Sequence, residues 1–130
     1  MHFYRFAFLL VLLFSVSTQM SAQKEILKIA DTYFKNEVYQ KAAQYYLSAG
    51  KKAGDKDVRF KLAVCYFETN DVATSKGLFN KLYQDQYDKR ELSYYLAMIA
   101  HDEWEFERAI SHYKAYLRKL PGGHKTEKWL

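Results

Sequence analysis

A related sequence segment occurs three times along the chain, and no other feature limits its fold as strongly. The segment KIADTYF (28–34) corresponds to KLAVCYF (61–67), and both correspond to YLAMIAH (95–101). Each segment contributes one small residue at the same place: Ala30, Ala63 and Ala97. Tandem periods of about 20 to 50 residues indicate structural units that stack on their neighbours and bury a shared core.

The apolar residues within each repeat have helical spacing. Ile26, Ile29, Ala30 and Tyr33 form an i, i+3, i+4, i+7 stripe, and a similar stripe runs through residues 62–67. Short polar breaks at 35–37, 69–71 and 102–103 separate the halves of the repeats, and their Asn and Asp residues are typical helix N-caps. The sequence therefore predicts an all-α fold of six helices, paired as antiparallel hairpins in repeats at about 23–55, 56–89 and 90–122.

The second halves of the repeats align with the same offsets and carry a recognisable motif. Small residues recur at Ala42, Ser75 and Ala109, and large aromatic residues follow at Tyr46, Phe79 and Tyr113. This pattern resembles the tetratricopeptide repeat, which implies an α-solenoid of three helix–turn–helix units. The sequence departs from that motif at single positions, where the motif has bulky, aromatic or proline residues: Arg59, Ser93, Ala100 and Tyr87.

The N-terminal segment 1–22 has the layout of a secretory signal peptide. Arg5 lies before an apolar run from Phe6 to Phe14, and the small residues Ser21 and Ala22 follow a polar flank. The alternative is an uncleaved membrane anchor, but this run is much shorter than the roughly 20 residues of a spanning helix. We therefore expect cleavage after Ala22 and export to the periplasm, with a further association with the outer membrane left open.

The resemblance implies that the first helix of each repeat lines a concave face on which a partner peptide or helix binds. Most of the side chains that would face this groove are apolar, and apolar residues on a solvent-facing surface are typical of protein interfaces. Alternatively, the rest of a longer protein fills the groove in cis, and the repeats act as a structural spacer or self-association unit. The predicted groove residues are Leu27, Asp31, Phe34, Phe60, Val64, Phe67, Tyr94, Met98 and His101.

No constellation of residues predicts catalysis or cofactor binding. His101, His112 and His124 lack the spacing of a zinc site, and the sequence contains no glycine-rich phosphate loop. The acidic residues between Asp102 and Glu107 suit the start of a helix, where the helix dipole favours negative charge. We expect neither an enzyme nor a site for a metal, a cofactor or a small-molecule substrate.

Charge and cysteine content narrow the set of partners further. The net charge is +5, but basic and acidic residues are interleaved, which does not predict nucleic-acid binding. Cys65 is the sole cysteine, so it is either a small buried hydrophobic residue or half of an intermolecular disulfide. The expected partner is a protein, and any membrane contact would come through partners or further domains.

Residues 123–130 restart like another helix after Pro121, which predicts the start of a capping helix or of a further repeat. We accordingly expect this chain to be the N-terminal part of a longer protein. An exported set of such repeats also resembles the N-terminal region of OmpA-family envelope proteins from bacteria with type IX secretion. That resemblance implies a periplasmic docking module that scaffolds a cell-envelope or secretion complex.

Overall fold

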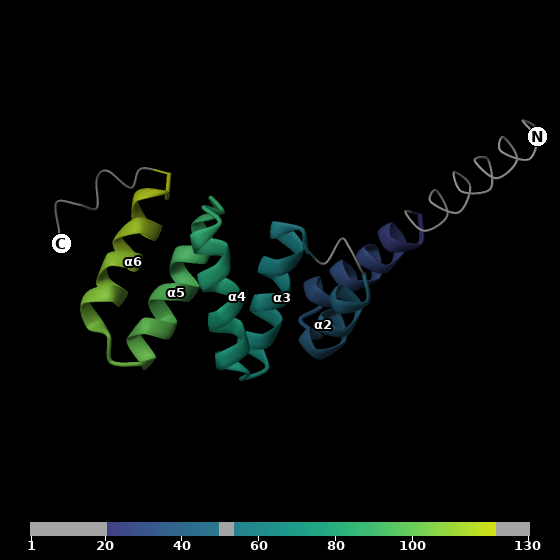
Figure 1. The fold of residues 1–130 in the computed structure, drawn as a ribbon, viewed down its shortest axis with the longest axis horizontal. Helices are drawn as coiled ribbons and strands as arrows, with labels where there is room; N and C mark the ends of the chain where they lie inside the picture. Colours follow the sequence, from purple (N-terminus) through teal and green to yellow (C-terminus); the bar gives the residue numbers. More distant parts are fainter. Residues whose placement is uncertain (1–20, 50–53, 122–130) are drawn as a thin grey trace, which may run out of the picture.

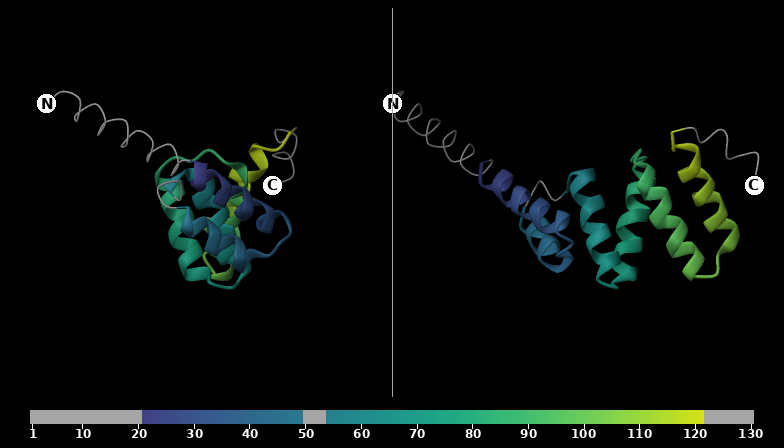
Figure 2. Two further views of the ribbon diagram at one scale, coloured as in Figure 1. Left: turned by 90° about the vertical axis from the view of Figure 1, so that its right-hand side faces the viewer. Right: turned by 180° about the vertical axis from the view of Figure 1, so that it is seen from behind.

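The computed structural model describes residues 21–49 and 54–121, which form a row of antiparallel helices (Figure 1). Helical backbone covers residues 21–35, five further helices follow, and the described residues contain no strand. The predicted all-α solenoid of helix–turn–helix repeats is confirmed, and the same succession of helices is visible from behind (Figure 2). The five helices are α2 (Tyr39–Ser48), α3 (Lys56–Glu68), α4 (Val72–Gln84), α5 (Arg90–Asp102) and α6 (Phe106–Arg118).

The turn inside each repeat has the same backbone geometry. Glu37, Asn70 and Trp104 have φ angles of 58°, 66° and 63° and occupy equivalent positions in the three repeats. In every turn the next residue donates its N–H to the carbonyl five positions earlier, which is the Schellman motif that ends a helix. The N···O distances are 2.9 Å for Val38 to Tyr33, 2.8 Å for Asp71 to Tyr66 and 2.9 Å for Glu105 to Ala100.

Only one of the three polar breaks supplies the predicted side-chain cap. Asp71 accepts a hydrogen bond from the Thr74 N–H at 3.2 Å and caps α4. The residues at the N-caps of α2 and α6 are Val38 and Glu105, whose side chains make no capping bond. The Schellman turn explains this difference. The turn residues end the first helix, and the residue after them becomes the N-cap of the second helix. That residue is an aspartate only in the second repeat.

Two hydrophobic clusters that share packing residues form a continuous core from the helix over 21–35 to α5. One cluster lies among residues 21–35, α2 and α3, and includes Ala30, Tyr46 and Cys65, all fully buried. The other lies among α3, α4 and α5, and includes Phe60 and Phe79. Phe34, Tyr39 and Leu78 pack against both clusters, so no polar layer divides the first repeat from the second.

The small residues at equivalent positions of the repeats lie in the core. Ala30, Ala63 and Ala97 are completely buried, as the repeat alignment predicts. Ser75 replaces the usual alanine of the second helix, and its hydroxyl donates to the Ala63 carbonyl at 2.9 Å. The buried hydroxyl is therefore satisfied and costs the core little.

Two of the predicted segments lie outside the described residues. These are residues 123–130 and the proposed signal peptide, except for Ser21 and Ala22, which belong to the helix over 21–35. Among residues 21–49 and 54–121, no helix has both the length and the apolar character needed to cross a membrane.

Candidate partner-binding surface

The middle of the predicted groove is core and not surface, which corrects the expectation for two of its residues. Phe60 and Val64 are 5% and 4% exposed and belong to the hydrophobic cluster among α3, α4 and α5. Phe67 is half-buried and packs edge-on against Tyr95, with ring centroids 5.3 Å apart. These three side chains therefore stabilise the solenoid and present little surface to a partner.

Tyr95 on α5 covers both phenylalanines from the next repeat, and Phe60 is also in contact with Phe79 and Tyr87 of its own repeat. The Tyr95 ring stacks on Phe79 at 5.1 Å and meets Phe60 edge-on at 6.0 Å. Burial raises the pKa of the Tyr95 hydroxyl to about 12, so the side chain stays neutral at physiological pH. Sequence reasoning missed this contact because the covering residue comes from the next repeat.

Lys61 on α3 is equivalent to Tyr95 one repeat earlier, and it likewise contacts the preceding repeat. Its Nζ donates to Oδ1 of Asp31 at 2.7 Å, and the Tyr46 hydroxyl donates to the same oxygen at 2.6 Å. Burial alone would raise the pKa of Asp31, but these hydrogen bonds and the Lys61 charge outweigh it and lower the pKa below its ordinary value. Asp31 thus joins three helices.

The first-repeat part of the predicted groove is half-buried. Leu27 packs against the first cluster, and Phe34 packs against both clusters. The Phe34 ring lies 5.8 Å from Tyr39 and 6.3 Å from Tyr46, edge-on to both. Both tyrosines therefore serve as interhelical packing residues, and Tyr45 is half-buried with its ring stacked on Tyr33 at 5.4 Å.

The third-repeat part of the groove is the part that remains open among the described residues. Tyr94 is 39% exposed, His101 is exposed and Met98 is half-buried, whereas their counterparts one repeat earlier are largely covered. Tyr94 leans on α6, with its ring 5.4 Å from Tyr116 and 6.4 Å from Tyr113. Tyr94, Met98 and His101 on α5, with Tyr113 and Tyr116 on the adjoining edge of α6, form a surface that we call the α5 face.

A second exposed apolar area, absent from the sequence-based prediction, lies at the turn between α5 and α6. Trp104 is 79% exposed, Phe106 49% and Ile110 53%, and the Trp104 and Phe106 rings lie 5.9 Å apart. His101 lies 5.9 Å from Phe106, so this area adjoins the α5 face. The repeat alignment could have revealed it, because Trp104 occupies the position of two polar residues, Glu37 and Asn70.

The polar side chains that remained as candidates for chemistry have structural partners. Glu103 forms an ion pair with Lys76 at 2.6 Å, and Glu105 with Arg108 at 2.7 Å. Cys65 is a fully buried free thiol, and burial raises its pKa to about 12. Nowhere in the described part of the chain do three or more His, Cys, Asp or Glu side chains gather as metal ligands would.

Comparison with protein families supports the interpretation of this arrangement. A tetratricopeptide-repeat family model matches residues 57–87, which span α3, α4 and the turn after them. The match and the three helix pairs together support a tetratricopeptide-repeat protein, and such repeats generally mediate protein–protein interactions without enzymatic activity. Neither the curated proteins nor the solved structures gave a match to this chain.

Proposed function

We propose that this chain is a non-enzymatic module that binds a protein partner through the α5 face. The observation that carries this proposal is the contrast between equivalent residues. Tyr94 is 39% exposed where Phe60 is 5% exposed, and His101 is exposed where Phe67 is half-buried. The exposed Tyr94 and His101, with the half-buried Met98 between them, lie beside half-buried tyrosines and have the composition of an interface core, where aromatic residues and methionine are enriched.

The chemistry of this face favours an amphipathic helix or an extended peptide with apolar anchors. Met98 supplies a flexible thioether that adapts to an aliphatic or aromatic side chain. Tyr94 offers ring area together with a hydroxyl, and His101 offers a ring nitrogen at the rim. The nine groove residues predicted from the sequence stay a prediction as binding residues, and the α5 face contains three of them: the exposed Tyr94 and His101 and the half-buried Met98.

Crosslinking at an exposed position of the α5 face, compared with an exposed position elsewhere on the protein, tests the proposal. A photo-crosslinking amino acid at position 94 should capture a discrete partner in the native host, and Met98→Asp should abolish that crosslink while circular dichroism stays unchanged. The matched control is the same crosslinker at position 47, where Leu47 is 55% exposed on α2, away from the α5 face. Equal capture at both positions would contradict a specific interface.

We also propose that the chain acts in the cell envelope, exported to the periplasm and scaffolding an envelope or secretion complex. The support is the basic start, the apolar run from Phe6 to Phe14 and the small residues before position 23. A role like that of the repeats in OmpA-family envelope proteins of type IX-secreting bacteria rests on that layout. Fractionation of the host should place the protein in the periplasm or with outer membranes, and a cytoplasmic pool of unprocessed protein would contradict export.

One observation favours the alternative that the face is filled in cis. Trp129 comes one repeat length after Tyr95, and Tyr95 is the residue that covers the equivalent face of α3. A following helix in the same register would therefore place an aromatic ring over Tyr94 and His101, the counterparts of Phe60 and Phe67. Replacement of Trp129 with alanine should then raise the proteolytic or hydrogen-exchange accessibility of α5, whereas a partner-binding face leaves α5 unaffected by that change.

A further inference from the structure

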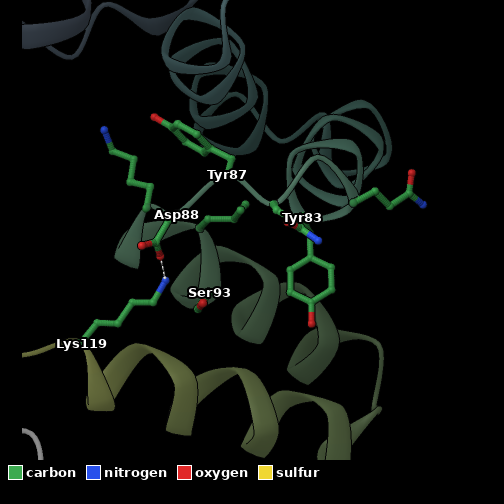
Figure 3. A pocket seen from close by; sticks show the side chains of 9 residues that line it. Tyr83, Tyr87, Asp88, Ser93 and Lys119 are labelled. Carbon is green, nitrogen blue, oxygen red and sulfur yellow. Dashed lines mark hydrogen bonds and ion pairs between the residues drawn. The ribbon is translucent and has the colours of Figure 1, made fainter.

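A cleft of about 610 Å³ lies between the α4–α5 connection, the first turn of α5 and the end of α6. Figure 3 shows Lys119 extending from α6 to Asp88, with Ser93 of α5 beside them. The wall is mixed, with two lysines, one carboxylate, two amides and two phenol rings. The lining residues are Tyr83, Gln84, Gln86, Tyr87, Asp88, Lys89, Leu92, Ser93 and Lys119.

The equivalent place in the second repeat is bridged by a charge pair. Arg59 on α3 donates from Nη1 to Oδ2 of Asp85 at 3.0 Å and from Nη2 to the Gly54 carbonyl at 3.2 Å. Lys56 adds a bond from Nζ to the Asp85 carbonyl at 2.7 Å. The start of the first helix is thus tied to the end of the second.

The third repeat has lost both members of that pair. In the repeat alignment Ser93 takes the place of Arg59, and Lys119 takes the place of Asp85. A serine hydroxyl cannot reach across the space that a guanidinium fills, so the space stays open. The charge at its outer edge has also changed from negative to positive, so a second cation there would be repelled.

We propose that this cleft binds a carboxylate side chain, Asp or Glu, in an extended segment of a protein partner. The incoming carboxylate would supply the negative charge that Asp85 supplies in the second repeat, with Lys119 as its cation. The Ser93 hydroxyl and the amides of Gln84 and Gln86 are additional donors on the wall. This site is separate from the α5 face and does not depend on the function proposed for that face.

The present partners of the two lysines decide which of them serves the ligand. Lys89 is held by Asp57 at 3.5 Å and lies 4.9 Å above the Phe60 ring, so it is already engaged with α3. Lys119 pairs with Asp88, whose side chain is 84% exposed. A pair this exposed contributes little to stability, so a ligand carboxylate can displace Asp88.

The test uses two acetylated and amidated tripeptides, Ala-Glu-Ala and Ala-Gln-Ala, titrated into the folded protein at low salt. The amide NMR signals of residues 83–93 and 119 should shift saturably with the Glu peptide and not with the Gln peptide. Lys119→Gln should weaken binding up to about fivefold, because an ion pair made by so exposed a lysine is weak. Lys114→Gln, a change of an exposed lysine on the same helix, is the control and should have no effect.

Two further variants should change the affinity for the Glu peptide in opposite directions. Asp88→Asn removes the internal competitor and should tighten binding of the Glu peptide severalfold. Ser93→Arg combined with Lys119→Asp restores the pair of the second repeat and should abolish binding without lowering helicity. Equal shifts with both peptides, or an unchanged affinity in Lys119→Gln, would overturn the proposal. Both measurements can be made without the double variant, so they do not depend on whether it folds.

Discussion

Trp104 is a bulky residue in the left-handed region of backbone conformation, with a φ angle of 63°. A non-glycine residue there costs about 1–2 kcal/mol, partly offset by the greater entropy that glycine loses on folding. Because Trp104 is 79% exposed, replacing it removes little buried area. We expect Trp104→Gly to raise the free energy of unfolding in urea by about 0.5–1 kcal/mol.

The equivalent turn of the second repeat supplies the comparison. Asn70 has the same conformation, but asparagine tolerates it well, so Asn70→Gly should gain only a few tenths of a kcal/mol. A Trp104→Gly variant that gains no more than Asn70→Gly would show that the indole makes a stabilising contact beyond its 5.9 Å approach to Phe106.

Cys65 should react slowly in the native protein. The thiolate is the reactive form, and burial raises the pKa of this thiol to about 12, so almost none is present at neutral pH. Labelling with a thiol reagent at pH 8 should be slower by several orders of magnitude than in the urea-unfolded chain. Fast labelling of the folded protein, or a covalent dimer on a non-reducing gel, would contradict this prediction.

At the scale of helices, the Asp31 cluster should make stability depend on acidic pH. The folded state lowers the pKa of Asp31, so its contribution is fully present above the ordinary Asp value and is lost as the pH falls through the folded pKa. Asp31→Asn should lose up to about 1 kcal/mol at neutral pH, a modest amount because the carboxylate is 40% exposed.

Urea unfolding between pH 7 and pH 2.5 measures this effect. The Asn variant should show a shallower loss of stability below pH 4 than the wild type, and Tyr46→Phe should show part of that change. Asp57 remains in both variants, and the hydrogen bond from Tyr87 and the charge of Lys89 lower its pKa too, so some acid dependence should persist. Identical pH profiles for the wild type and Asp31→Asn would show that the cluster contributes no linked proton.

The helices could be predicted from the sequence because each depends on information within one repeat. The regular spacing of Ala30, Ala63 and Ala97 locates them in the core without reference to any contact between repeats. Exposure along the first helices could not be predicted in the same way. The burial of Phe60 depends in part on Tyr95, a residue of the following repeat that the motif leaves unspecified. The cleft at Ser93 likewise becomes evident only when the Arg59–Asp85 pair is seen in three dimensions.

At the scale of the whole molecule, Tyr95 links the second and third repeats. The contacts between α4 and α5 are less extensive than those within the pairs α3–α4 and α5–α6, and the Tyr95 ring adds aromatic contacts to Phe60, Phe67 and Phe79 across this junction. In a stacked-repeat protein, stability is close to a sum of repeat and neighbour terms, so weakening one junction lets one end open alone.

We therefore expect Tyr95→Ala to lower the free energy of unfolding by about 2–3 kcal/mol, less than a fully buried aromatic would because Tyr95 is half-buried. Hydrogen exchange should show α5 and α6 losing protection first, while residues 21–35, α2 and α3 keep most of theirs. Tyr95→Phe is the matched control and should retain the coupling, because the rings remain in contact. An equal loss of protection in every helix of the described chain would contradict this prediction. It would mean that the solenoid unfolds as a single cooperative unit and that Tyr95 stabilises all of its helices equally.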